Sequence, residues 1–241
     1  FGVDPAENLY PLSKDNHNVL CEYWNPEVAL SFQTKFDLIT AQNVFAHVDD
    51  VHDFLQACVV SLNDDGYVVI QTSQADMILD SQFDTIYHEH LSFFSSLSMK
   101  MCANINGFSL VDVRKTEVHG GSYVFVLQLG DRDESLADKQ IQNENNRGLY
   151  KSETYKQYAN NCLSVVNDFR NVVEKFKSDG YKVVGYGAAA KGNTFLNFAE
   201  IDLDYIVDDN ELKWDLMTPG RNIEIKNPTS LASEDKDKLV V

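Results

Sequence analysis

Short apolar runs bounded by turn residues alternate along this chain with segments whose apolar positions recur at helical spacing. The runs up to residue 129 are candidate β-strands, and helix-like segments separate the earlier ones. This alternation is typical of an α/β fold built on a largely parallel sheet. The candidate strands cover residues 1–3, 19–24, 36–41, 67–72, 110–115 and 122–129.

Local signals mark where several of these elements begin or turn. Asn25 comes directly before a proline, which predicts an asparagine N-cap with proline in the first helical turn. Asp49 and Asp50 precede a segment whose apolar residues fall on one stripe, which predicts a second capped helix. Between the last two strands, the pair Gly120-Gly121 predicts a β-hairpin.

A change of composition marks the middle of the chain. Residues 130–146 are polar, and residues 152–177 show one long helical pattern. A strand, a glycine-rich turn, a helix and another strand then follow over residues 182–207. This second α/β pattern predicts two domains, residues 1–130 and 131–241.

Charge and cysteine content restrict the partners and the compartment. The chain has 241 residues, with 20 Lys+Arg against 37 Asp+Glu and a net charge of −17. We therefore expect no nucleic acid and no membrane as a partner, because both require a cationic surface. The 4 cysteines are scattered without a C-x-x-C pair, which favours a reducing, cytoplasmic location over a disulfide framework. No apolar run approaches the ~20 residues of a transmembrane helix, and no signal peptide is visible.

Ionisable side chains gather most densely between Asp84 and His90, in the run Asp-Thr-Ile-Tyr-His-Glu-His. Tyr87, Glu89 and His90 supply a phenolic donor, an orienting carboxylate and a general base. In a helix Tyr87 and His90 would share a face, and in a strand His88 and His90 would. The spacing is not the H-E-x-x-H zinc pattern, so we predict acid–base chemistry without a metal. A solvated cluster without function is the alternative.

Polar residues also stand at the carboxyl ends of two predicted strands, where doubly wound α/β sheets bind their ligands. Asp4 closes the first strand and is a candidate acceptor for a ribose, although an acid at such a place also serves as a turn former. Gln42, Asn43 and His47 follow a later strand and are candidates to face a ligand. The alternative is that Asn43 caps a turn and His47 packs against a helix.

Two glycine-containing turns are further candidates for ligand binding. Residues 185–193 follow a strand and open a helix, and their glycines and Lys191 suit phosphate binding. The turn matches neither a Walker A motif nor a complete G-x-G-x-x-G. His119 lies in the sequence His-Gly-Gly-Ser, which on its own favours a hairpin turn over a ligand loop.

Taken in order, these segments resemble the S-adenosylmethionine-dependent sugar-nucleotide C-methyltransferases of the C3-methylating type. The Tyr-His-Glu-His block and the Lys-Gly-Asn turn are the specific parts of a resemblance that extends over nearly the whole chain. It implies a class I methyltransferase Rossmann-like sheet followed by a second Rossmann-like domain that binds the sugar nucleotide. The matching runs are residues 1–6, 43–47, 83–95, 119–122, 185–193, 207–210 and 218–220.

The resemblance also implies a reaction and its residues. A methyl group would move from S-adenosylmethionine to C3 of a dTDP-linked 4-keto-6-deoxy sugar, in deoxysugar biosynthesis, through an enolate formed by His90 as base. Tyr87 and Glu89 would orient His90 or the sugar, and His47 would stabilise the enolate oxygen. The resemblance further implies cofactor contacts from Asp4, Ala41 and Asn43, and substrate contacts from Gly187, Lys191, Asn193 and His119. We expect a monomer.

The chain begins at Phe1 without a methionine and ends at Val241 in what looks like a strand cut short. By resemblance, an N-terminal zinc domain, the first strand of the sheet with its glycine-rich turn, and the final strand are missing. We therefore interpret the chain as a fragment and expect it to be inactive alone, because backbone donors to the cofactor are lost.

Two other functions stay open at the level of sequence. One is an NAD(P)-dependent oxidoreductase built on residues 185–193, with Asp208 ~20 residues further on as the ribose acid. The other is a non-catalytic nucleotide-sugar binding module.

Overall fold

The computed structural model describes residues 1–73 and 76–241 and divides the chain into two compact units. The first unit contains Phe1–Asp76 and Glu89–Gly148, and the second contains Met77–His88 and Leu149–Val241. The segment Met77–His88 therefore belongs to the second unit although the chain on both sides of it belongs to the first.

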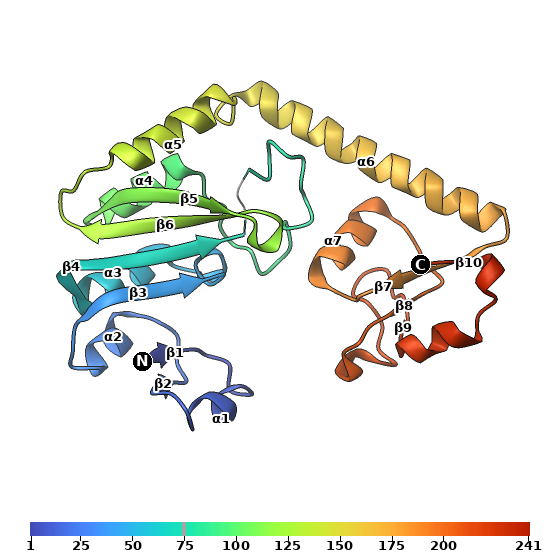
Figure 1. Ribbon diagram of the computed structural model, residues 1–241, viewed down its shortest axis with the longest axis horizontal. Helices are drawn as coiled ribbons and strands as arrows, with labels where there is room; N and C mark the ends of the chain where they lie inside the picture. Colours follow the sequence, from blue (N-terminus) through green and yellow to red (C-terminus); the bar gives the residue numbers. More distant parts are fainter. Residues whose placement is uncertain (74–75) are drawn as a thin grey trace. The chain divides into compact units, whose positions relative to one another are not determined.

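The main sheet of the first unit has the strand order β3-β4-β6-β5 (Figure 1). Strands β3 and β4 are parallel, whereas β6 pairs antiparallel with both of its neighbours. The hairpin predicted at Gly120-Gly121 is confirmed, because it joins β5 to β6 with Thr116 opposite Ser122. The bounds are β3 Phe36–Gln42, β4 Leu62–Thr72, β5 Phe108–Thr116, η2 Val118–Gly120 and β6 Ser122–Leu129.

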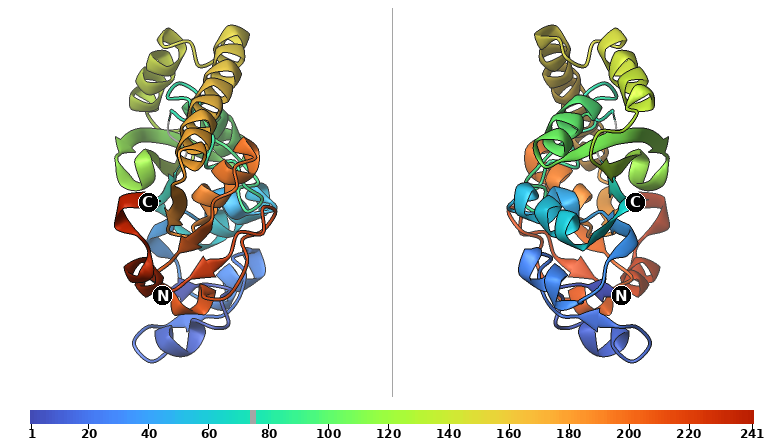
Figure 2. Two further views of the ribbon diagram at one scale, coloured as in Figure 1. Left: turned by 90° about the vertical axis from the view of Figure 1, so that its right-hand side faces the viewer. Right: turned by 90° about the vertical axis from the view of Figure 1, so that its left-hand side faces the viewer.

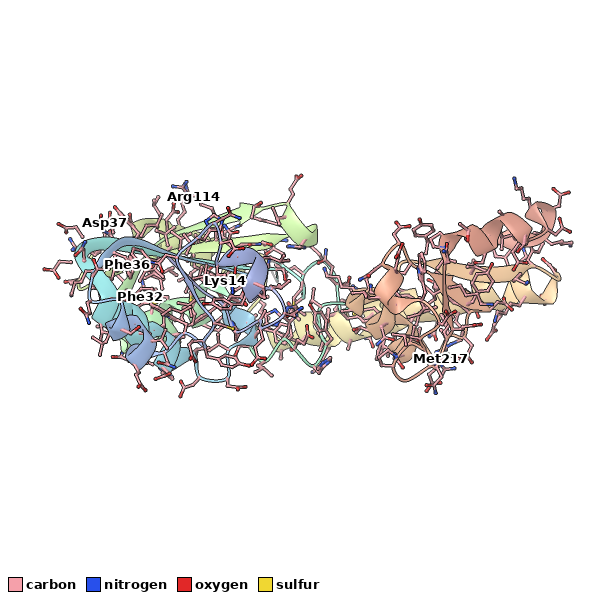
Figure 3. All side chains as sticks on the ribbon, turned by 90° about the horizontal axis from the view of Figure 1, so that it is seen from below. Lys14, Phe32, Phe36, Asp37, Arg114 and Met217 are labelled. Carbon is pink, nitrogen blue, oxygen red and sulfur yellow. The ribbon has the colours of Figure 1, made fainter. Side chains whose placement is uncertain are left out.

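Strands β1 (Gly2–Val3) and β2 (Val19–Leu20) form a separate parallel pair. Among the described residues no strand pairs with the second edge of β3, and a hollow of about 230 Å³ is lined by residues of β1 and β3. Phe32 and Phe36 border this hollow with ring centroids 5.6 Å apart (Figure 3). Strand β2 is shorter than the expected run to residue 24, because its partner β1 ends at a turn in which Asp4 accepts from the amide of Ala6.

The predicted helix starts are confirmed. Asn25 accepts a hydrogen bond from the amide of Val28 at 2.9 Å, and Asp50 accepts from the amides of His52 and Asp53. These side chains satisfy amides that have no partner within the helix, so each fixes where its helix begins. The helices of this part are α1 Tyr10–Ser13, α2 Pro26–Ser31, η1 Phe45–His47, α3 Val51–Ser61 and α4 Ser96–Ile105.

Helix α5 (Ser135–Asn146) packs on the first unit, although its sequence is polar. Its Glu144 is fully buried, and the carboxylate accepts hydrogen bonds from the amide of Ser96 at 3.2 Å and from its hydroxyl at 2.6 Å. The chain therefore passes from the first unit to the second between Gly148 and Leu149, whereas the change of composition predicts a boundary near residue 130. The difference arises because a buried hydrogen-bonded carboxylate, not an apolar stripe, anchors α5.

The second unit combines one long helix with a four-stranded parallel sheet of order β10-β7-β8-β9. Helix α6 (Ser152–Ser178) is continuous over 27 residues (Figure 2). Its Val166 and Val173 pack with Val183 and Ile206 in one apolar core. The other elements are β7 Lys182–Tyr186, α7 Ala190–Ala199, β8 Tyr205–Val207, η3 Glu211–Lys213, β9 Ile225–Lys226, η4 Pro228–Ser233, η5 Lys236–Lys238 and β10 Leu239–Val240. Within residues 1–73 and 76–241, no helix has the length and apolar character needed to cross a membrane.

Replacing Asp50 by alanine tests the capping of α3. We expect Asp50→Ala to lower the free energy of unfolding by about 1 kcal/mol, because two amides of the first turn lose their acceptor. The matched control Asp49→Ala removes the adjacent acid, which is not the N-cap. It should change the free energy of unfolding by less than about 0.5 kcal/mol. Urea unfolding followed by circular dichroism measures both; equal losses would contradict the assignment of the cap.

Candidate functional site

Asp4 stands at the end of β1 with its side chain exposed. Its Oδ1 accepts from the amide of Ala6 at 2.8 Å, so the turn-forming role considered from the sequence is present in the structure. Among the described residues, none donates a hydrogen bond to Oδ2, which is available to a ligand hydroxyl. The two roles are therefore compatible in one carboxylate.

The end of β3 presents a second polar position. Ala41 is buried, and Asn43 adopts a left-handed backbone with φ of 52° while its amide donates to the carbonyl of Gln71 at 3.0 Å. Within the described residues, Asn43 Oδ1 is buried without a hydrogen-bond partner. An unsatisfied buried carbonyl costs about 1–3 kcal/mol, so this oxygen suits a ligand that brings a hydrogen-bond donor.

Two histidines from distant parts of the chain lie against each other in the first unit. The ring centroids of His47 and His90 are 4.7 Å apart at an angle of 69°. The carbonyl of Ala46 accepts hydrogen bonds from the amides of Leu91 at 2.8 Å and Ser92 at 3.2 Å. These bonds join the residues after His90 to the turn that carries His47. Backbone hydrogen bonds therefore hold the two histidines next to each other. His90 is buried with 8% of its surface exposed.

The surroundings of His47 favour its neutral form. Burial lowers the pKa of its imidazole, His90 lowers it further, and the carboxylate of Glu89 raises it in partial compensation. His47 therefore contributes to stability in full above the ordinary histidine pKa of 6.5. That contribution is lost as the pH falls through the lowered pKa of the folded state, because the unfolded chain then binds more protons.

The cluster predicted between Asp84 and His90 forms neither a regular helix nor a strand. Glu89 and His90 belong to the first unit with His47, whereas Tyr87 and His88 belong to the second. Tyr87 is half-buried, and its amide donates to the carbonyl of Thr85 at 3.1 Å. The first unit thus brings together three of the four predicted catalytic residues.

The glycine-rich turn of the second unit is built as its sequence pattern predicts, between β7 and α7. Gly187 has a φ of 93°, where a side chain would be strained, and its amide donates to the carbonyl of Val207 at 2.7 Å. The amide of Asn193 donates within α7 to Ala189, while its carbonyl and Oδ1 accept from Asn197. Hydrogen bonds within the second unit therefore fix both ends of the turn.

Lys191 borders a hollow of about 370 Å³ that the sequence does not predict. Its Nζ lies 3.9 Å from Asp84 Oδ2, and both side chains are about one-third exposed. Asp84 falls within the ionisable run noticed in the sequence, but no local signal pairs it with a lysine on α7. The hollow is lined by Ser81, Gln82, Phe83, Asp84, Lys191, Gly192 and Phe195.

Asp208 is bonded on both carboxylate oxygens. Oδ1 accepts from the amide of Asn210 at 2.8 Å, and Oδ2 accepts from the amide of Ala188 at 2.7 Å and from Lys213 Nζ at 3.0 Å. The bond from Asn210 is the largest cause that lowers the pKa of this carboxyl, so it is ionised and held by the turn. A carboxylate used in this way is a poor acceptor for a ribose.

His119 lies at the tip of the β5–β6 hairpin with a φ of 56° and an exposed side chain. It belongs to the first unit, while Gly187, Lys191 and Asn193 belong to the second. Over the described part of the chain, no group of three or more His, Cys, Asp or Glu side chains has the arrangement of a metal site.

A family model described as a methyltransferase domain matches residues 1–113, and one described as a C-methyltransferase C-terminal domain matches residues 117–241. The C-methyltransferase NovU of Streptomyces niveus is 29% identical over 98% of this chain and 59% of its own length. The chain thus spans about three-fifths of the curated relative it matches.

Solved structures with a similar fold are more distant in sequence. An S-adenosylmethionine-dependent methyltransferase from Clostridium acetobutylicum is 12% identical with a TM-score of 0.41, covering 54% of this chain and 74% of that one. Magnesium protoporphyrin IX methyltransferase from Synechocystis, solved with S-adenosylmethionine, is 9% identical with a TM-score of 0.37. The match covers 54% of this chain and 58% of that one.

The fold and the matched domains define the class of this protein as an α/β methyltransferase, which confirms the expected fold class. The family model for the C-methyltransferase C-terminal domain covers more than half of the chain, and its description is narrower than that of a methyltransferase domain. The chain belongs to the S-adenosylmethionine-dependent C-methyltransferase family.

Exchanging the neighbours of His47 tests the electrostatics of the pair. We expect His90→Gln to raise the pKa of His47, because a repelling imidazole is removed, and Glu89→Gln to lower it, because an attracting carboxylate is removed. Nuclear magnetic resonance titration of the imidazole protons measures both, with His17 as an internal reference in the same spectra. Shifts of equal sign in the two variants would refute this account.

Proposed function

We propose that this chain carries the catalytic centre of a C-methyltransferase that acts on C3 of a dTDP-linked 4-keto-6-deoxy sugar. The observation that carries the proposal is the contact of His47 with His90, whose ring centroids are 4.7 Å apart. The pair combines a buried imidazole suited to remove a proton with a second imidazole held neutral beside it. The name of the relative NovU, a C-methyltransferase, supports methylation at carbon.

The chemistry assigned to the pair follows from the ketone of the substrate. A carbonyl at C4 acidifies the C3–H bond, and an imidazole nitrogen of His90 takes that proton while the electron pair moves toward the C4 oxygen. The neutral His47 donates its N–H to this oxygen as negative charge develops. Glu89 and Tyr87 orient the base and the sugar. A positioned base of this kind contributes about 10²- to 10⁴-fold to the rate.

The cofactor is assigned to the ends of β1 and β3, two strands that line one hollow. Asn43 Oδ1, buried and unpartnered among the described residues, suits a donor group of S-adenosylmethionine, and Asp4 suits its ribose hydroxyls. Ala41 is a small buried residue near the end of β3. When bound, the cofactor supplies an electrophilic methyl group on a positively charged sulfur.

The sugar nucleotide is assigned to the turn between β7 and α7 in the second unit, and His119 of the first unit is a separate candidate for a substrate contact. Gly187 admits close approach of the backbone, Lys191 offers a cation, and Asn193 completes the turn. The internal bonding of Asp208 supports a sugar nucleotide over NAD(P), since the oxidoreductase alternative needs that carboxylate for a ribose.

Replacing His90 tests the catalytic assignment. In the full-length protein, His90→Asn should reduce methyl transfer by about 10²- to 10⁴-fold because the base is removed. Binding of S-adenosylhomocysteine, measured by calorimetry, should stay unchanged, since the cofactor residues are intact. The assay follows labelled methyl from S-adenosylmethionine to a panel of dTDP-ketosugars. The control His17→Asn should keep full activity; a fully active His90→Asn would remove the centre of the proposal.

Replacing Lys191 tests the substrate turn. Lys191→Met should raise the KM for the dTDP-ketosugar by about tenfold or more, because a charge-assisted contact to the pyrophosphate is lost. The KM for S-adenosylmethionine should not change. The control Lys175→Met removes a lysine from α6, outside the turn. An unchanged KM for the sugar nucleotide in Lys191→Met would place the pyrophosphate elsewhere.

A further inference from the structure

Asp76 is a buried carboxylate with donors from three parts of the first unit. Its Oδ1 accepts from the hydroxyl of Tyr123 at 2.8 Å, and its Oδ2 accepts from Lys115 Nζ at 2.7 Å and Arg147 Nη1 at 2.6 Å. Only 5% of the Asp76 surface is exposed. The donors come from β5, from β6 and from the residue after α5, so one side chain joins three elements that are distant in sequence.

Ionisation of Asp76 depends on these donors. Burial alone raises the pKa of its carboxyl, but the hydrogen bonds from Lys115, Arg147 and Tyr123 outweigh burial and hold the pKa below its usual range. The charged form is therefore the stable one at neutral pH. Two cations and a hydroxyl on one buried carboxylate give a cluster whose members support each other, because charge-assisted hydrogen bonds are strong where water is excluded.

Asp76 lies where the chain leaves the first unit. Asp76 is the last residue of the first unit before the segment Met77–His88, which packs within the second unit. There Phe83 stacks on Phe195 with centroids 5.6 Å apart, and Gln82 accepts from the hydroxyl of Tyr158 at 3.1 Å. The chain then returns to the first unit at Glu89.

The return point is also fixed by hydrogen bonds. The amides of Leu91 and Ser92 donate to the carbonyl of Ala46, beside His47. The first unit therefore holds the chain at Asp76, where the segment leaves, and at residues 91–92, where it returns. His90 and Glu89 lie between these two points, close to the second.

The same carboxylate also reaches the hairpin that carries His119. Lys115 and Tyr123 face each other in the pairing of β5 with β6, near the tip of the hairpin. Both donate to Asp76. The buried carboxylate of Asp76 thus connects the start of the segment Met77–His88 to the two strands of the β5–β6 hairpin near its turn.

We propose that Asp76 is a positioning residue that fixes where the segment Met77–His88 leaves the first unit and thereby holds His90 in its contact with His47. The link to activity rests on the proposed function, whereas the link to the position of His90 does not. The amides of Leu91 and Ser92 report that position, because their bonds to the carbonyl of Ala46 hold the chain next to His90 against the turn that carries His47.

The first experiment is hydrogen exchange on the full-length protein with Asp76→Asn. We expect the amides of residues 77–92 to exchange about tenfold faster or more, because the charge-assisted bonds to Asp76 are weakened. The amides of α3 and β4 should keep their rates. The matched control Asp65→Asn removes a carboxylate paired with Arg132 in the same unit and should leave both regions unchanged. Faster exchange throughout the unit would show a structural role only and overturn the proposal.

A gentler variant keeps the proposal testable if Asp76→Asn fails to fold. Lys115→Met removes one partly exposed donor and leaves Tyr123 and Arg147 on the carboxylate. We expect the same local increase in exchange, smaller in size, and a rise in the pKa of His47 as His90 loosens. Unchanged exchange at Leu91 and Ser92 in this variant would overturn the proposal.

Activity measurements then separate the positioning role of Asp76 from the proposed role of His90 as the base. In the full-length protein, Lys115→Met should lower kcat while the KM for S-adenosylmethionine stays constant. Faster exchange with full activity would support the positioning of His90 and count against its role as the base. If exchange at Leu91 and Ser92 is unchanged in Lys115→Met while His90→Asn is inactive, the assignment of His90 as the base stands. The positioning role of Asp76 is then overturned.

Discussion

The candidate catalytic centre depends on one carbonyl group. The carbonyl of Ala46 accepts the amides of Leu91 and Ser92, and these two hydrogen bonds bring the segment that follows β4 against the turn that follows β3. A pair of backbone bonds fixes both the distance and the direction of a chain, so the rings of His47 and His90 have little freedom to part. Burial is the largest cause of the lowered pKa of His47, and the second cause, repulsion from His90, depends on these same bonds.

Much of the fold could be predicted because its signals are local. The caps Asn25 and Asp50 act on amides two or three residues away, and Gly187 takes a backbone conformation that other residues resist. The hairpin at Gly120-Gly121 is equally local. In each case the residue type and its immediate neighbours contain the physical cause, so no knowledge of the rest of the chain is required.

The remaining features depend on partners that no local pattern identifies. Glu144 belongs to a polar helix and becomes a buried anchor only because Ser96 presents an amide and a hydroxyl to it. Asp76 is a single acid in an otherwise undistinguished stretch, and its donors lie on β5, on β6 and after α5. For the candidate catalytic residues, the sequence identified the run around Tyr87 but predicted only a helix or a strand for it. The chain adopts neither, because its residues are divided between two compact units.

The charge of the chain narrows how it can hold an anionic substrate. With a net charge of −17, attraction over the whole surface is excluded, so binding must come from particular cations and amides. Lys213 is 3.0 Å from Asp208, and Lys115 and Arg147 are within 2.7 Å of Asp76, so each is already bonded to a structural carboxylate. Lys191 and Asp84 are separated by 3.9 Å on a partly exposed surface, which is beyond hydrogen-bond distance and weak in energy. An anionic substrate therefore has to draw on local donors such as the turn that carries Lys191, because the net charge of the chain supplies no attraction.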